Sequence, residues 1–146
     1  MPPRIVGVDF GWARVGIAVA DPLRIFAAPL GTFGRKEAIA KLVEIRDREG
    51  LDLVVLGWPI QLDGREGETV DLVRKFERQL EGALHGVRIM RLDERFTSKI
   101  AQDAIRRSGG KRSERRKKER VDSAAAAILL QDYLDSRDND LRSDRD

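Results

Sequence analysis

The chain has 146 residues, of which 36% are charged and none is Cys. This length suits a single domain, and the lack of Cys excludes disulfides, thiolate metal sites and Cys nucleophiles. No apolar run approaches the roughly 20 residues of a transmembrane helix, and Asp9 interrupts the apolar N-terminal segment, unlike a signal peptide. We therefore expect a soluble, cytoplasmic domain.

The order of the predicted elements indicates an α/β fold. Arg4–Asp9 is almost continuously apolar, which is typical of a central buried strand, and the connection at Gly11 predicts a hairpin with Val15–Ala20. Ala27–Phe33 is predicted as a third strand. The later elements are helices over Lys36–Glu49 and Glu68–Leu84, strands over Leu51–Gly57 and Val87–Leu92, a short helix from Thr97, and an alanine-rich helix over Arg120–Asp135. This order predicts a mixed sheet flanked by helices.

Acidic residues occur at three points where a fold has little structural use for them. Asp9 ends a buried strand, Asp93 and Glu94 follow another strand, and Asp122 lies near the start of the last helix. Burying a carboxylate is costly unless it is paired, hydrogen-bonded or bound to a metal. Each acid also has a simpler explanation, as a turn residue, as an exposed partner of Arg95, or as a helix N-cap.

Taken together, Asp9, Glu94 and Asp122 indicate a metal site. These three points of an α/β fold can converge at one edge, and clustered carboxylates stay ionised only with a cation between them. Oxygen ligands select Mg²⁺ or Mn²⁺, and pairs of such ions promote phosphodiester hydrolysis. The sequence therefore predicts a metal-dependent nuclease, with these three acids as ligands and catalytic residues and two ions when substrate is bound. The single histidine, His85, is expected at the surface.

Positive charge is concentrated between Arg106 and Arg120, where nine basic and two acidic residues give a net charge of +7. We interpret this segment as a loop that holds a phosphate backbone; the alternative is a solvated linker. The predicted nucleic-acid contacts there are Lys111, Arg112, Arg115 and Arg116. Residues 137–146 are polar and are predicted to form a disordered tail after a single domain over residues 1–136.

Four motifs in the expected order resemble the YqgF/RuvX family. They are the D-x-G-x-x-R-h-G-h-A pattern from Asp9 to Ala18, Gly57-Trp58-Pro59 with Asp63-Gly64, Asp93-Glu94-Arg95-Phe96-Thr97-Ser98, and Val121-Asp122 with Ala125-Ala126. The resemblance implies a ribonuclease H-like fold and an acidic site at Asp9, Glu94 and Asp122. Arg14 and Arg95, inside these motifs, are further predicted nucleic-acid contacts. Trp58 replaces the family's usual leucine and is expected to alter substrate contact.

The resemblance also implies a substrate and partners. These are the 5′ end of the 16S ribosomal RNA precursor and ribosomal precursor particles, with a Holliday junction in DNA as the alternative. Two other classes compete with a nuclease. A sugar-kinase or actin-like ATPase also has D-x-G after its first strand, but it needs two related domains. A non-catalytic RNA- or ribosome-binding module would be distinguished by an activity assay. The sequence leaves the oligomeric state open.

Overall fold

The computed structural model describes residues 2–11, 13–59, 68–93 and 114–143. Within the last helix, side chains are described from Ser123 to Arg137. Glu94, Arg95, Lys111, Arg112 and the short helix predicted from Thr97 therefore lie outside the described residues.

Five strands form one mixed sheet, as predicted. They are β1 (Arg4–Phe10), β2 (Val15–Ala20), β3 (Ala27–Phe33), β4 (Leu51–Trp58) and β5 (Arg88–Asp93). Their order across the sheet is β3-β2-β1-β4-β5. The hairpin of β1 and β2 is antiparallel, as is the β2–β3 pair, whereas β4 runs parallel to both β1 and β5. β1 is therefore the central strand, and β3 and β5 are the two edges.

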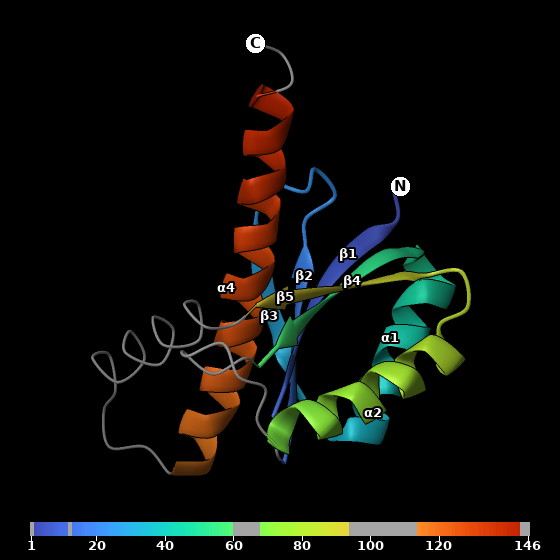
Figure 1. Cartoon of the computed structure of the whole chain (residues 1–146), viewed down its shortest axis with the longest axis vertical. Coiled ribbons are helices and arrows are strands. Elements are labelled where there is room, and N and C mark those ends of the chain that lie inside the picture. The colour runs from blue at the N-terminus through green and yellow to red at the C-terminus, as the bar shows by residue number, and fades with distance from the viewer. Residues whose placement is uncertain (1, 12, 60–67, 94–113, 144–146) are drawn as a thin grey trace.

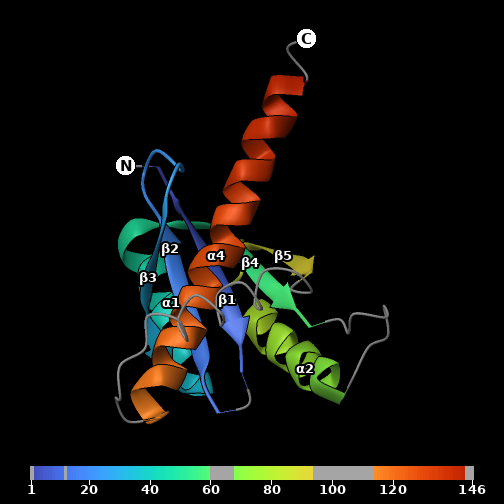
Figure 2. The same ribbon diagram turned by 90° about the vertical axis from the view of Figure 1, so that its left-hand side faces the viewer.

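Helices cover both faces of this sheet (Figures 1 and 2). On one face lie α1 (Arg35–Glu49) and α2 (Glu68–Ala83), and on the other lies α4 (Glu114–Ser143). Two apolar cores result, one between the sheet and α1 and α2, the other between the sheet and α4. In the part of the chain that the structure describes, no helix is long and apolar enough to span a membrane.

Successive residues of β1 point to opposite faces of the sheet, as strand geometry requires. Val6, Val8 and Phe10 belong to the core beneath α1 and α2. Ile5 belongs to the core beneath α4. Gly7 faces the same way, since its nearest neighbours are residues of α4. Asp9 shares this face by the same alternation, which brings it to the side of the sheet that α4 covers.

Helix α4 is longer than the predicted Arg120–Asp135. Its backbone begins at Glu114 and ends at Ser143, so Arg115 and Arg116 stand in its first turns and not in a loop. A glutamate at position 114 suits a helix N-terminus because the helix dipole favours negative charge there, and Lys and Arg are good helix formers. The predicted polar tail likewise begins inside this helix.

The contact between α4 and β1 is closest at Gly7. A Cβ atom at this position would lie 2.8 Å from Cβ of Leu130 and 2.9 Å from the carbonyl oxygen of Ala126. Real Cβ atoms avoid such distances because of steric repulsion, so α4 can approach β1 this closely only where the strand has no side chain. Gly7 therefore fixes the height of α4 above the sheet.

We predict that Gly7→Ala lowers the free energy of unfolding by about 1–3 kcal/mol, because α4 must move away from the sheet. Gly82→Ala in α2 is the matched control. A Cβ at Gly82 meets nothing within 4 Å, and the better helix propensity of alanine should raise the free energy of unfolding by up to about 1 kcal/mol. Urea unfolding measures both. Equal stability of Gly7→Ala and the unchanged protein would contradict the direct contact.

Candidate functional site

Asp9 is the best defined of the predicted acids. It lies next to the end of β1, opposite Gly16 of β2 in the antiparallel pair. Its side chain is half-buried, between the buried residues Val8 and Phe10. Asp9 thus places a carboxylate on the α4 side of the sheet, at the carboxyl end of the central strand, where open α/β sheets bind ligands.

Asp122 is brought to the same end by the path of α4. Figures 1 and 2 show that α4 runs antiparallel to β1. Ala126 lies over Gly7, and residue 122 is four residues, about 6 Å along the helix, before Ala126. Asp9 is two strand residues, about 6.6 Å, beyond Gly7 in the same direction. The backbone of residue 122 is therefore level with Asp9, on the same face. The side chain of Asp122 lies outside the described part.

Asp93 belongs to the opposite face of the sheet. It pairs in register with Trp58 of β4, which packs into the core beneath α1 and α2. Arg91, two residues earlier on the same strand, bonds to Glu77 of α2. Since residues two apart on a strand share a face, Asp93 is on the α2 side, away from Asp9. This placement removes Asp93 from the face that carries Asp9.

Arg14 lies close to Asp9 in the chain and in the fold. The N–H of Gly11 donates to the carbonyl oxygen of Arg14 at 2.8 Å, which closes the turn between β1 and β2. Arg14 is half-buried. The turn that follows Asp9 therefore carries one of the predicted phosphate contacts at the same end of the sheet.

The expectation that Trp58 alters substrate contact is corrected by the structure. Trp58 is the last residue of β4, and only 4% of its surface is exposed. The guanidinium of Arg91 lies 3.8 Å from the centroid of its ring. Arg91 Nε and Nη2 also donate to the two carboxylate oxygens of Glu77, at 2.8 and 2.7 Å. Trp58 therefore supports an arginine that ties β5 to α2.

Sequence reasoning missed this Glu77–Arg91 pair, although one signal for it was present. Glu77 lies beside Phe76 in α2, among residues that face the core, and it is itself buried. A buried acid needs a cationic or hydrogen-bonding partner. The identity of that partner was not readable, because Arg91 is on a different element.

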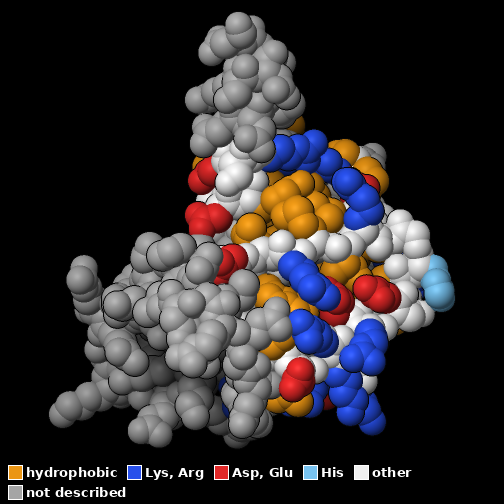
Figure 3. Space-filling view, viewed as in Figure 1, with side chains coloured by type: hydrophobic (Ala, Val, Ile, Leu, Met, Phe, Trp, Pro, Cys, Tyr) orange, Lys and Arg blue, Asp and Glu red, His pale blue; other side chains and the backbone are white. Residues whose placement is uncertain are grey.

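The remaining charged groups give no further cluster. No three His, Asp or Glu side chains lie close enough to hold a metal ion within the described residues, and two acids of the predicted trio have side chains beyond that part. Over α2, Lys and Arg alternate with Asp and Glu (Figure 3). The same view shows the histidine at the margin of the molecule, which confirms that His85 is exposed.

Comparisons with known proteins agree with this architecture. The family model described as "RuvX: Holliday junction resolvase" matches residues 3–136. The chain is 45% identical over 131 residues to the "Putative pre-16S rRNA nuclease" of Salinibacter ruber, covering 90% of this chain and 92% of that protein. It is 42% identical over 133 residues to the protein of the same name from Chlorobaculum tepidum, covering 91% and 94%.

One solved structure supports the fold independently. The structure of T. thermophilus RuvC in complex with a Holliday junction substrate aligns with a TM-score of 0.57, covering 94% of this chain and 97% of that one. The two sequences are 13% identical, so the likeness concerns the fold alone. The predicted ribonuclease H-like fold is thereby confirmed.

Proposed function

Since this chain belongs to the RuvX family of Holliday junction resolvases, we propose that it is a metal-dependent nuclease that hydrolyses phosphodiester bonds in structured nucleic acid. The observation that carries the proposal is the position of Asp9. It is a half-buried carboxylate on the central strand, on the face and at the level to which α4 brings residue 122. The carboxyl end of a central strand is also where open α/β sheets bind their ligands.

We propose Asp9, Glu94 and Asp122 as the catalytic and metal-binding residues. The donor chemistry fits Mg²⁺ or Mn²⁺, because all three side chains offer carboxylate oxygens. Two such ions, when bound with substrate, would stabilise the attacking and leaving oxygens of the scissile phosphate. The position of Asp93 on the α2 side favours its neighbour Glu94 as the ligand from β5.

The basic residues have a separate task in this proposal. A nucleic-acid backbone that approaches three carboxylates is repelled unless cations offset the charge. Arg14, Arg95, Lys111, Arg112, Arg115 and Arg116 are proposed to hold the phosphates beside the scissile bond. Such contacts hold the backbone without reading its sequence.

The proposed substrate is the 5′ end of the 16S rRNA precursor, alone or in ribosomal precursor particles. The names of the relatives from Salinibacter ruber and Chlorobaculum tepidum support it. It implies the cytoplasm, where the precursor is transcribed. A four-way DNA junction is the second candidate, favoured by the family description. A non-catalytic RNA-binding module is the third, and it predicts binding without cleavage.

The first prediction is that Asp9→Asn removes cleavage. The purified protein is incubated with a 16S precursor fragment or a four-way DNA junction, with Mg²⁺, Mn²⁺ or EDTA. Loss of even an outer partner of a metal ligand costs roughly 10–100-fold, so losing a ligand should slow cleavage by more than about 100-fold. Nucleic-acid binding and the far-ultraviolet circular dichroism spectrum should be retained.

Asp47→Asn, at an exposed position of α1, is the control and should cleave normally. Cleavage in EDTA, or undiminished cleavage by Asp9→Asn, would contradict the proposal.

The second prediction separates Asp93 from Glu94. Glu94→Gln should abolish metal-dependent cleavage, whereas Asp93→Asn should retain at least about one tenth of the rate, since Asp93 is on the other face of the sheet. Binding of Mn²⁺, measured by isothermal titration calorimetry, should weaken in the same order. The reverse order would mean that the ligand from β5 is Asp93 and that the proposed register is wrong.

The third prediction concerns the basic segment. Replacing Lys111, Arg112, Arg115 and Arg116 with alanine should weaken binding alike across RNA or DNA sequences. Each lost phosphate contact should lower the slope of log K against log salt by about 0.7 for single strands or about 0.9 for duplex DNA. Replacing the exposed Lys75 and Arg78 of α2 with alanine is the control for loss of positive charge elsewhere on the surface. If both variants bind with an unchanged salt dependence, the segment is only a linker.

A further inference from the structure

The large apolar side chains that the described residues expose are all in one stretch of the chain. Leu23, Ile25, Phe26 and Leu30 are 76%, 45%, 69% and 41% exposed. They lie on the connection between β2 and β3 and on β3 itself, which is an edge of the sheet. Single exposed apolar residues are ordinary, but a group of them marks an interaction surface.

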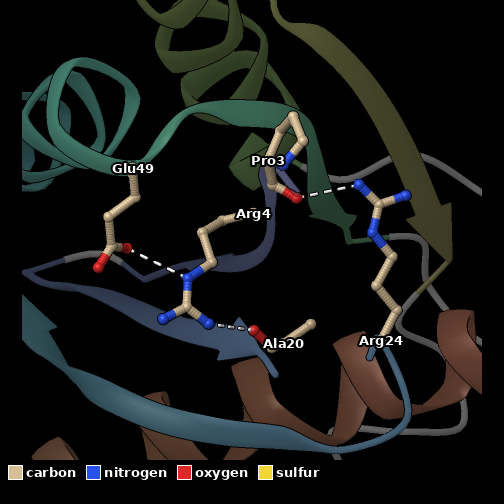
Figure 4. Close-up of polar contacts among 5 residues, drawn as sticks. All are labelled: Pro3, Arg4, Ala20, Arg24 and Glu49. Carbon is tan, nitrogen blue, oxygen red and sulfur yellow. Dashed lines mark hydrogen bonds and ion pairs between the residues drawn. The ribbon is translucent and has the colours of Figure 1, made fainter. Parts of the chain in front are cut away.

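Hydrogen bonds define the conformation of this connection. The carboxylate of Asp21 accepts hydrogen bonds from the N–H groups of Ile25 and Phe26, both at 2.8 Å. The bond from Phe26 is the largest cause of the lowered pKa of Asp21. Arg24 adopts a left-handed backbone with φ of 59°, and its guanidinium donates to the carbonyl oxygen of Pro3 at 2.9 Å (Figure 4).

Helix α4 ties the same connection down from the other side. Gln131 donates to the carbonyl oxygen of Ile25 at 2.8 Å and accepts from the N–H of Ala27 at 2.9 Å. A loop that is hydrogen-bonded to two other parts of the chain, Pro3 and α4, loses little entropy when it binds. The exposed side chains are therefore already positioned before a partner binds.

A cavity of about 730 Å³ opens beside these side chains, between β2, β3 and α1. Phe26, Leu30 and Ile45 contribute apolar surface to it. Arg4 also lines it and is held in place, because its guanidinium donates to Glu49 at 3.2 Å and to the carbonyl oxygen of Ala20 at 3.0 Å (Figure 4). Projecting apolar groups and a hollow thus lie next to each other on one surface.

The charges around the cavity cancel. It is lined by three basic and three acidic residues, Arg4, Lys41, Arg48, Asp21, Glu44 and Glu49. Lys41 and Arg48 pair with Glu44 at 3.6 and 3.1 Å, in addition to the pair of Arg4 with Glu49. A surface without net positive charge is unsuited to a phosphate backbone. It is suited to a surface of the same mixed composition, which its own copy provides.

We propose a contact between two copies of this chain about a two-fold axis. It is made by the hairpin surface, which consists of Leu23, Ile25, Phe26 and Leu30 of the β2–β3 hairpin and the adjoining cavity. In such a contact the same surface meets itself, so the apolar groups of each copy fill the hollow of the other. The charged residues around the cavity of one copy then face those of the other copy, and neither set carries a net charge.

Side chains, and not strand pairing, make this contact. Pro29 has no N–H to donate, and the pairing of β2 with β3 skips Leu30, since Gly31 pairs with Ile17 and Pro29 with Ala18. A proline and an irregularity in an edge strand both hinder the addition of another strand.

The hairpin surface is at the opposite end of the sheet from Asp9. Arg4 and Ala20, which line the cavity, are the first residue of β1 and the last of β2. Asp9 is five residues along β1 from Arg4, or about 17 Å. A dimer formed here leaves both Asp9 ends directed outward and accessible, so the contact does not depend on the proposed nuclease activity.

Sedimentation velocity between about 1 and 100 μM, where contacts of modest affinity dissociate, tests the proposal. We expect a reversible dimer whose dissociation constant rises at least about tenfold in Phe26→Asp, because truncating a central aromatic residue commonly has this effect. Leu23→Ser is the milder variant. It alters the most exposed of these side chains, so its melting temperature should match that of the unchanged protein while its dimer weakens.

Lys75→Asp in α2, a charge reversal on a different surface, is the control and should dimerise normally. Cleavage by Leu23→Ser should equal that of the unchanged protein, which separates this proposal from the nuclease proposal. A monomer at every concentration would overturn the proposal in favour of a different protein partner. A dimer that neither Phe26→Asp nor Leu23→Ser weakens would overturn it as well.

Discussion

The contact of α4 with β1 at Gly7 is the constraint on which the arrangement of the molecule depends. Because Gly7 has no side chain, the backbone of α4 at Ala126 approaches the strand directly. The same contact sets where α4 lies along the strand, and with it the level of residue 122. A larger residue at either side of the contact would move the helix and the acid together.

Strand alternation then separates two tasks. Val8 and Phe10 face the core beneath α1 and α2, whereas Gly7 and Asp9 face α4. The acids proposed to catalyse hydrolysis are on the α4 side. On the opposite side, the Glu77–Arg91 pair, packed against Trp58, connects β5 to α2. A charged group on one face can therefore change without disturbing the packing of the other.

Much of this fold could be predicted because its strands are short apolar runs between turn residues. β2 and β3 have the predicted bounds, even with Pro29 inside an edge strand. The start of α4 was missed because a run of like charges suggested a loop, although its residues are good helix formers. The role of Trp58 was missed for another reason. Its partners Glu77 and Arg91 are far along the chain, and only the folded structure brings them together.

The distribution of charge also differs between the two ends of the sheet. The segment Arg106–Arg120 carries +7 in a chain whose net charge is +3, so the rest of the chain sums to −4. The last residues of this segment are the first turns of α4, at the end of the sheet where Asp9 lies (Figure 1). At the other end, the charges around the hairpin surface cancel. Because positive charge attracts a polyanion and a neutral surface does not, the proposed substrate and the proposed second copy of the chain would not compete for the same surface.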